Sequence, residues 1–351
     1  MGFRTAGLLR SRTLWMGRAY SSVPGGDVIF SGIQPSGTPH LGNYFGAIRQ
    51  WVEGPKTLRS LFSIADLHAL TGLHDPSEMR SNIIRLTAGL LASGLDPKAC
   101  ILFQQSQVQE HTELSWILGS LSSVQSLTRM TQYRDKTRGV KESPLGLLIY
   151  PVLQSADILL YKGTRVPIGE DNIQNLELAR SIARTFNRTY DTSLFPEPFS
   201  VLSESSKIKS LRNPANKMSK SDKDTRSCIY ISDPPELIRE KCKKAVTDCQ
   251  GSLSYDPVNR PGVSNLILIH ASILGVTPQR IVEEYSNLDT GGYKLLLADA
   301  LSEHFRPIRE RFGYYLKHEH VIHEVLKDGS DAAREIASST MKEVKSIIGF
   351  T

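Results

Sequence analysis

The sequence is poor in cysteine, and its four cysteines are scattered along the chain. Cys100, Cys228, Cys242 and Cys249 form no C-x-x-C pair, which argues against a zinc site and against a disulfide framework. Such cysteine usage fits a protein that works in a reducing compartment. The sequence also lacks a run of 18 apolar residues, so it offers no candidate transmembrane helix and predicts no membrane partner.

Acidic residues are absent from residues 1–26, which hold four arginines together with several serines and threonines. This composition is typical of a mitochondrial transit peptide, and no apolar stretch here is long enough for a secretory signal. The residues around Arg18 resemble a processing site, so we predict cleavage near Tyr20 and a mature protein in the mitochondrial matrix. A disordered cytosolic tail is the alternative interpretation.

A strong net charge is also missing from the body of the chain, residues 27–351. The net charge is +6, of which residues 1–26 contribute +4, residues 27–231 contribute +4 and residues 232–351 contribute −2. The body therefore carries only about +2, and overall basicity does not indicate a nucleic-acid binder. Any RNA contact must come from local patches.

One such patch lies at residues 129–141. It contains five basic residues and one acid: Arg129, Arg134, Lys136, Arg138, Lys141 and Asp135. Gly139 and Ser143-Pro144 make its second half a poor helix, so we interpret it as a mobile segment. Our hypothesis is an electrostatic lid that closes on a phosphate ligand; the alternative is a solvated basic loop.

The hydrophobic pattern predicts an α/β protein. Three short apolar runs are typical of buried parallel strands: residues 28–30, 61–64 and 101–103. Helical patterns separate these runs, which predicts a Rossmann-like doubly wound parallel sheet over residues 27–231. From about Asp233 only helical patterns remain, so we expect residues 232–351 to form an α-helical domain.

The first predicted strand leads into a turn rich in Gly, Pro and Ser, which ends in His40-Leu41-Gly42-Asn43 ahead of a helix predicted over residues 44–52. The N-terminus of that helix points at whatever lies in the loop. Gly42 permits close approach of a ligand, and His40 can donate a hydrogen bond to a phosphate. Ligands of doubly wound sheets bind beyond the carboxyl ends of the strands, where this turn falls.

A second loop places two lysines and two serines within five residues, Lys217-Met218-Ser219-Lys220-Ser221. The turn-forming Asn213-Pro214 ahead of it argues for a surface position. Two ammonium groups and two hydroxyls suit a polyphosphate whose charge must be neutralised during its transfer. A solvated linker is the alternative.

Taken together and in this order, the two stretches resemble the two signatures of class I aminoacyl-tRNA synthetases. Phe30 to Asn43, Gly169-Glu170-Asp171 and Ala245 to Asp248 narrow the resemblance to the tryptophanyl-tRNA synthetase family. The resemblance implies a ligase that converts L-tryptophan and ATP to tryptophanyl-adenylate and pyrophosphate, and then esterifies the 2′-hydroxyl of tRNA(Trp). It also implies a homodimer, Mg²⁺ held largely by ATP oxygens rather than by a protein metal site, and anticodon binding by the helical domain.

The resemblance also assigns the site residues. The catalytic residues would be His40, Lys217 and Lys220. The ATP-binding residues would be Gln34, His40, Leu41, Gly42, Asn43, Lys136, Gly169, Glu170, Asp171, Ile208, Lys217, Met218, Ser219, Lys220 and Ser221. The tryptophan-binding residues would be Phe30, Gly32, Gln34, His68, Tyr150, Gln154 and Asp157. The family usually has Gln where this chain has Asn172, whose amide reaches one carbon less.

Asp157 lies within an apolar helical pattern over residues 145–161. A buried carboxylate costs free energy unless it is paired, so Asp157 is either part of a structural ion pair or a ligand-binding group. The resemblance implies that it accepts the indole N–H, the one polar group of the tryptophan side chain. His68 is in the same way either a core histidine or a pocket residue.

No Ser-His-Asp or Cys-His constellation is visible, and the implied reaction needs none, because the carboxylate of the amino acid attacks the α-phosphate of ATP. The protein has to position both substrates and stabilise the departing pyrophosphate. Two alternatives stay open: a tyrosyl-tRNA synthetase, which shares the fold and a substrate-reading Asp, and a non-catalytic tRNA-binding relative. Five basic residues of the helical region are candidates for tRNA contact: Arg280, Lys294, Arg306, Arg309 and Arg311.

Overall fold

A computed structural model describes residues 26–72, 75–139, 142–202, 208–220, 222 and 224–351. Residues 1–25 of the predicted transit peptide and Ser221 of the lysine loop lie outside the described residues.

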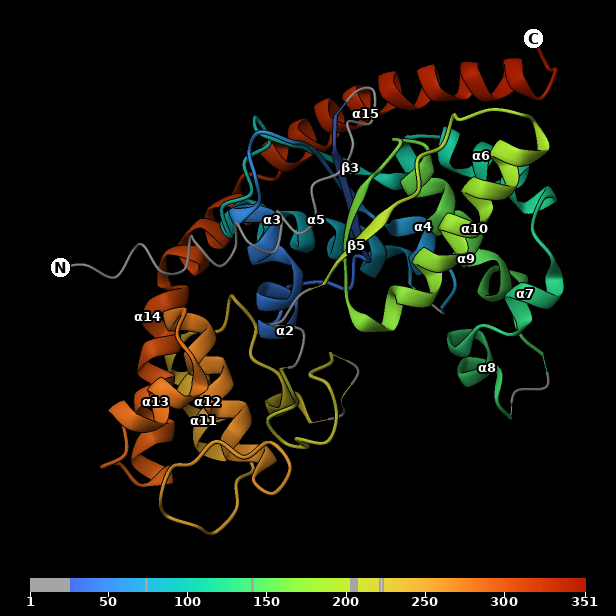
Figure 1. The fold of residues 1–351 in the computed structure, drawn as a ribbon. Helices are drawn as coiled ribbons and strands as arrows, with labels where there is room; N and C mark the ends of the chain where they lie inside the picture. The colour runs from blue at the N-terminus through green and yellow to red at the C-terminus, as the bar shows by residue number, and fades with distance from the viewer. Residues whose placement is uncertain (1–25, 73–74, 140–141, 203–207, 221, 223) are drawn as a thin grey trace.

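A parallel five-stranded sheet with the strand order β3-β2-β1-β4-β5 forms the centre of the molecule (Figure 1). Its strands are β1 (Val28–Ile33), β2 (Arg59–Ile64), β3 (Ile101–Gln104), β4 (Arg165–Ile168) and β5 (Phe199–Leu202). All paired strands are parallel, which confirms the predicted doubly wound sheet. β5 was not predicted, because four residues that include a serine give too weak a strand pattern.

Side chains on successive strand residues point to opposite faces of the sheet, so each face has its own hydrophobic core. Ile29, Phe62 and Leu102 belong to one core, which they share with α5 (Pro76–Ala92). The other face packs against three helices: α6 (Glu110–Ser120), α9 (Leu145–Leu159) and α10 (Ile173–Thr189). The predicted helix at residues 145–161 therefore exists, and it is buried on one face of the sheet.

The helix after β1 begins earlier than predicted. It runs through α2 (Leu41–Asn43), a π-helical turn (Tyr44–Ile48) and α3 (Arg49–Glu53). His40 caps it, because His40 Nδ1 accepts a hydrogen bond from the Asn43 N–H at 3.3 Å, while Asn43 Oδ1 accepts one from the His40 N–H at 3.2 Å. Asn43 thus stabilises the helix start on which His40 sits.

Beyond Asp233, the described residues form helices only, as predicted. They are α11 (Pro235–Lys244), α12 (Pro261–Leu274), α13 (Pro278–Glu284), α14 (Thr290–Lys317) and α15 (Glu319–Ile347). Proline occupies the first turn of α11, α12 and α13, where its missing N–H costs no helical hydrogen bond. Among the described residues, no single helix is long and apolar enough to cross a membrane; α12 and α13 pass that test only as a pair bent by 99°.

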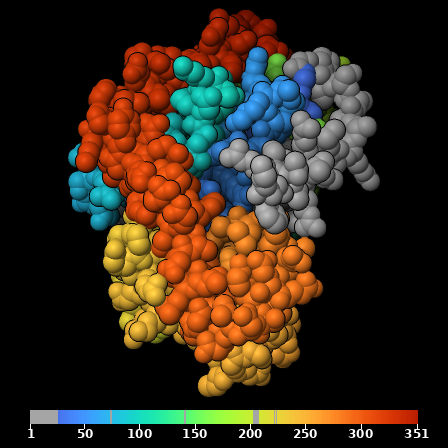
Figure 2. All heavy atoms as spheres, turned by 90° about the vertical axis from the view of Figure 1, so that its left-hand side faces the viewer, coloured from blue at the N-terminus to red at the C-terminus, as the bar shows by residue number. Residues whose placement is uncertain are grey.

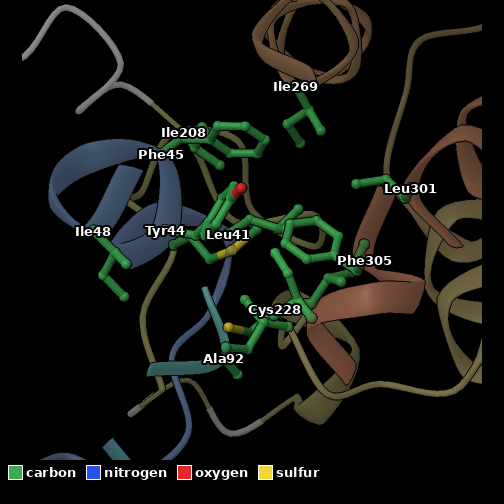
Figure 3. Packing of buried hydrophobic residues seen from close by; sticks show 14 of the residues in the cluster. Leu41, Tyr44, Phe45, Ile48, Ala92, Ile208, Cys228, Ile269, Leu301 and Phe305 are labelled. Carbon is green, nitrogen blue, oxygen red and sulfur yellow. The ribbon is translucent and has the colours of Figure 1, made fainter. Parts of the chain in front are cut away.

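The last two helices return to the catalytic sheet. Figure 2 shows α14 and α15 extending from the lower, helical part of the molecule across one face to its top. Tyr44 packs on Phe305 of α14 (Figure 3), with 5.0 Å between the ring centroids. His304 Nε2 lies 3.2 Å from the Tyr44 hydroxyl. One hydrophobic core thus continues across the boundary expected at residue 231, and the division into two domains stays a prediction.

α15 lies along β3, an edge strand of the sheet. The contact is so close that a Cβ added to Gly329 would overlap the carbonyl oxygen of Leu102. An edge strand otherwise exposes unpaired backbone groups, and covering it with a helix is one way to protect it.

Candidate active site

A cleft of about 410 Å³ opens beyond the carboxyl ends of β1, β2 and β4. It brings together most of the residues that the sequence predicts for the site: Phe30, Gly32, Gln34, His40, Gly42, Asn43, His68, Lys136, Tyr150, Gln154, Asp157, Gly169, Asp171, Lys217 and Met218. Leu41 and Ile208 are buried in the hydrophobic core instead, and Glu170, Ser219 and Lys220 do not line the cleft. The predicted roles of all these residues stay predictions.

A larger groove of about 1620 Å³ lies at the amino ends of the strands, between α15 and residues 192–201. It contains none of the predicted site residues. Because open parallel sheets bind ligands at the carboxyl ends of their strands, the smaller cleft is the better candidate for the active site.

His40 is buried at the helix start and lines the cleft. Burial, and then the charges of Lys220 and Lys217, lower the pKa of His40 to about 4, so the imidazole is neutral at neutral pH. Since Nδ1 accepts the hydrogen bond from Asn43, the proton of the neutral ring is on Nε2. His40 can therefore donate to a phosphate oxygen without carrying a charge.

Gly42 makes room for this histidine. A Cβ at position 42 would lie 2.8 Å from His40 Cε1, closer than such atoms approach in proteins. The glycine of the first signature thus allows the imidazole ring to fold back over the helix.

The lysine loop is anchored next to the His40 helix. Met218 is buried in the core, and its N–H donates to the carbonyl of Ile208 at 3.2 Å. Lys209 and Lys217 form an antiparallel bridge beside this bond. The loop therefore starts from a fixed backbone, whereas an adenine contact of Ile208 remains a prediction.

The two lysines of this loop have different surroundings. Lys217 Nζ lies 3.6 Å from the carboxylate of Asp171, and both side chains are 60% exposed, so their attraction is weak in water. Lys220 Nζ donates to the carbonyl of Ser36 at 2.9 Å, in the turn ahead of His40. Burial lowers the pKa of Lys220 to about 8.

The basic patch at residues 129–141 contains a short helix, α8 (Thr131–Thr137), so part of the segment expected to be mobile is helical. Lys136 lies over the Tyr150 ring at 5.6 Å from its centroid, and the Tyr150 hydroxyl donates to Gln132 at 2.6 Å. Gln132 in turn donates to the carbonyl of Asp171 at 2.7 Å. α8 is thereby attached to the rim of the cleft; the lid hypothesis stays a prediction.

One turn after Tyr150 on α9, Gln154 accepts a hydrogen bond from Asn175 at 2.8 Å, and Asn175 also donates to Asn172 at 3.2 Å. Asn172 lines the cleft even though its amide is one carbon shorter than the Gln usual in the family.

Asp157 is buried and lines the cleft, with its carboxylate held by His68, His111 and Gln105. Asp157 is thus paired inside the protein and still borders the cleft, and its role as a ligand-binding group stays a prediction. Sequence reasoning missed His111 and Gln105. The signal available was the requirement of a buried carboxylate for donors, but nothing in the sequence said which residues would supply them.

Three of the five candidate tRNA-binding residues donate side-chain hydrogen bonds to backbone carbonyls in the structure. Lys294 donates to Ala245 at 2.8 Å, Arg309 to Asp233 at 3.1 Å and Arg311 to Ala92 at 2.7 Å. These side chains anchor the helical region, whereas Arg280 and Arg306 form exposed pairs with neighbouring glutamates.

Within the described ranges, no group of three or more His, Cys, Asp or Glu side chains could hold a metal ion. The expectation that ATP oxygens hold Mg²⁺ stays a prediction.

Residues 27–306 match the family model described as tRNA synthetases class I (W and Y). The chain is 41% identical over 331 residues to the mitochondrial tryptophan–tRNA ligase of Caenorhabditis elegans, covering 92% of this chain and 91% of the relative. It belongs to the class I tryptophanyl-tRNA synthetases. A bacterial member, the tryptophan–tRNA ligase of Oceanobacillus iheyensis, is equally similar, with 42% identity over 92% of this chain and 98% of the relative.

Solved tryptophanyl-tRNA synthetases have the same fold. The Campylobacter jejuni enzyme, complexed with ADP and tryptophan, has a TM-score of 0.77 and 31% identity, covering 92% of this chain and 99% of that chain. The family predicted from the two signatures and from the residues that narrow them to tryptophanyl-tRNA synthetase is thus confirmed.

Proposed function

We propose that this protein is a mitochondrial tryptophan–tRNA ligase. It activates L-tryptophan with ATP and transfers the aminoacyl group to the 2′-hydroxyl of tRNA(Trp). The observation that carries the proposal is the cleft itself, which places the buried Asp157 carboxylate, the His40 helix start and Lys217 around one space. An acceptor for an indole and donors for a triphosphate are what this reaction requires.

In the first step, a carboxylate oxygen of tryptophan attacks the α-phosphorus of ATP. A new P–O bond forms, the bond to the β-phosphate oxygen breaks, and pyrophosphate leaves. His40 Nε2–H and the ammonium groups of Lys217 and Lys220 stabilise the charge that develops on the leaving group. Mg²⁺ bound through ATP oxygens would add positive charge there.

In the second step, the 2′-hydroxyl at the end of tRNA(Trp) attacks the carbonyl carbon of the adenylate. The ester C–O bond forms, the C–O bond of the mixed anhydride breaks, and AMP leaves with the proton of the hydroxyl group. No side chain has to act as a covalent nucleophile in either step, so the enzyme works by positioning and charge stabilisation.

ATP–pyrophosphate exchange with tryptophan and, separately, with tyrosine tests this function. We expect exchange that depends on tryptophan, followed by charging of tRNA(Trp). Exchange with tyrosine instead would reveal the sister enzyme, and no exchange with either amino acid would point to a non-catalytic relative. Both alternatives are disfavoured, because the curated relatives named above are tryptophan–tRNA ligases and both signatures are intact.

The mitochondrial part of the proposal is supported by the acid-free, Arg-rich residues 1–26 and by the mitochondrial relative. Bacterial relatives of equal similarity give it no further support. Fluorescence of a C-terminally tagged chain, together with sequencing of the mature N-terminus, tests it. We expect signal in the matrix and an N-terminus near Tyr20; cytosolic fluorescence from an uncleaved chain contradicts it.

We further propose a homodimer, in which residues 27–231 carry catalysis and residues 232–351 bind the anticodon. Trp116 on α6 is 80% exposed, and Val124 at the start of α7 (Val124–Thr128) is 59% exposed. Large apolar side chains that are exposed on two successive helices support a contact with a second copy. Sedimentation of the unaltered protein and of Trp116→Glu tests it, with a dimer expected for the first and a monomer for the second.

A further inference from the structure

The buried carboxylate of Asp157 accepts hydrogen bonds from three side chains of the protein. His111 Nδ1 lies 2.6 Å from Oδ1, and Gln105 Nε2 lies 2.8 Å from the same oxygen. His68 Nε2 lies 2.7 Å from Oδ2. Two donors thus converge on one oxygen and a single donor contacts the other.

The direction of each bond follows from its surroundings. Burial acts to raise the pKa of Asp157, but the electrostatic attraction and the hydrogen bonds of His68 and His111 outweigh it and hold that pKa well below its usual range, so Asp157 only accepts. Gln105 Oε1 accepts from the N–H of Leu67 at 3.2 Å, which fixes its amide with Nε2 toward Asp157.

His111 is oriented in turn by Tyr161, whose hydroxyl lies 2.8 Å from His111 Nε2. Burial raises the pKa of Tyr161 well above its ordinary value, so the phenol keeps its proton and can donate it to Nε2. With Nε2 of His111 accepting from Tyr161, the N–H of His111 is on Nδ1, the atom that faces Asp157.

A carboxylate offers about four lone-pair positions. His111 and Gln105 fill the two of Oδ1, and His68 fills one of Oδ2, so the open position is on Oδ2. Asp157 lines the cleft, whereas His111 and Gln105 are fully buried and do not. These two residues therefore contact the Asp157 carboxylate from the protein interior and not from the cleft.

We propose that His111, together with Gln105, is a positioning residue that turns Oδ2 of Asp157 toward the N–H of the bound indole. The pair sets how strongly the enzyme prefers tryptophan to an analogue without that N–H. The inference rests on the proposed role of Asp157 as the reader of tryptophan. His111 touches neither substrate, and its effect passes through the Asp157 carboxylate.

The test compares pyrophosphate exchange with tryptophan and with the analogue in which sulfur replaces the indole N–H. His111→Leu removes the donor to Oδ1, and we expect the ratio of kcat/KM between the two substrates to fall about tenfold, the size of one oriented hydrogen bond. The loss should appear in the KM for tryptophan, with the KM for ATP unchanged. His111→Asn, whose amide N–H can replace the Nδ1 donor, should restore most of the ratio.

Gln105→Met removes the second donor to the same oxygen and should lower the ratio in the same direction, even if His111→Leu folds poorly. A purely structural role would lower activity toward both substrates equally and leave the ratio unchanged, which overturns the proposal. If the unaltered enzyme itself shows no preference for tryptophan over the sulfur analogue, then Asp157 does not recognise the indole N–H. That result refutes the proposed role of Asp157, on which the role of His111 depends. A preference that survives both His111→Leu and Gln105→Met refutes the positioning role alone.

Discussion

Lys220 donates a hydrogen bond from Nζ to the backbone carbonyl of Ser36 across 2.9 Å, and its Nζ lies 3.3 Å from the Ser36 hydroxyl. The second lysine of the lysine loop is thus attached to the turn that leads into His40. In this structure the two signatures of the family are joined directly, through a charged group that ATP would have to share or displace.

The pKa of Lys220, lowered to about 8 by burial, predicts a pH dependence of adenylate formation. A lysine with a lowered pKa is charged below that value and neutral above it, so the single-turnover rate should fall as the pH rises through about 8. His40 should add no change near neutrality, because its pKa is about 4. In Lys220→Arg the guanidinium stays charged throughout, so the decline near pH 8 should disappear. An unchanged profile in that variant would assign the decline to another group.

Alanine substitutions of Lys217 and Lys220 should mainly lower kcat. Both lysines are proposed to stabilise charge that develops in the transition state, so kcat should fall by about 100-fold or more while the KM for tryptophan changes little. Lys209→Ala is the matched control, since Lys209 pairs with Lys217 through the backbone and does not line the cleft. Normal exchange rates in both Lys217→Ala and Lys220→Ala would contradict the assignment.

If the patch at residues 129–141 acts as a lid, ATP with a tryptophan analogue should protect it from proteolysis. Lys136→Ala should slow adenylate formation, because Lys136 lines the cleft from its place over Tyr150. Neutralising Arg134 and Arg138 should instead weaken tRNA binding and make its salt dependence shallower. Equal proteolysis with and without ligands, together with a normal rate for Lys136→Ala, would leave a solvated basic loop.

Gly329→Ala should destabilise the protein, because the new Cβ would overlap the carbonyl oxygen of Leu102. Overpacking of this kind costs about 1–3 kcal/mol, measured as a lower denaturant midpoint. Gly313→Ala on α14 is the control, since a Cβ at this position would have no atom within 4 Å apart from its chain neighbours and the backbone of its own helix. The substitution also replaces a glycine inside a helix by a better helix former. It should raise stability by about 0.5–1 kcal/mol. Equal midpoints for the two variants would show that α15 can move away from β3.

Features that depend on residues close together in the sequence could be predicted from the sequence. The doubly wound sheet follows from short apolar runs separated by helices, and His40 and the lysine loop follow from local composition. The donors to Asp157 could not be predicted, because His111 and Gln105 are 46 and 52 residues away from it in the sequence and only the fold brings them together. In the same way, no local pattern indicates that Gly329 lies on Leu102 or that Arg311 reaches Ala92.

The place of α15 on β3 also has a consequence for the order of events during synthesis. The edge strand Ile101–Gln104 emerges from the ribosome long before Glu319–Ile347, the helix that covers it. Until α15 is made, the backbone of β3 has no cover on that side and can pair with other chains. We therefore expect nascent chains, and chains truncated ahead of Glu319, to need a chaperone over this strand.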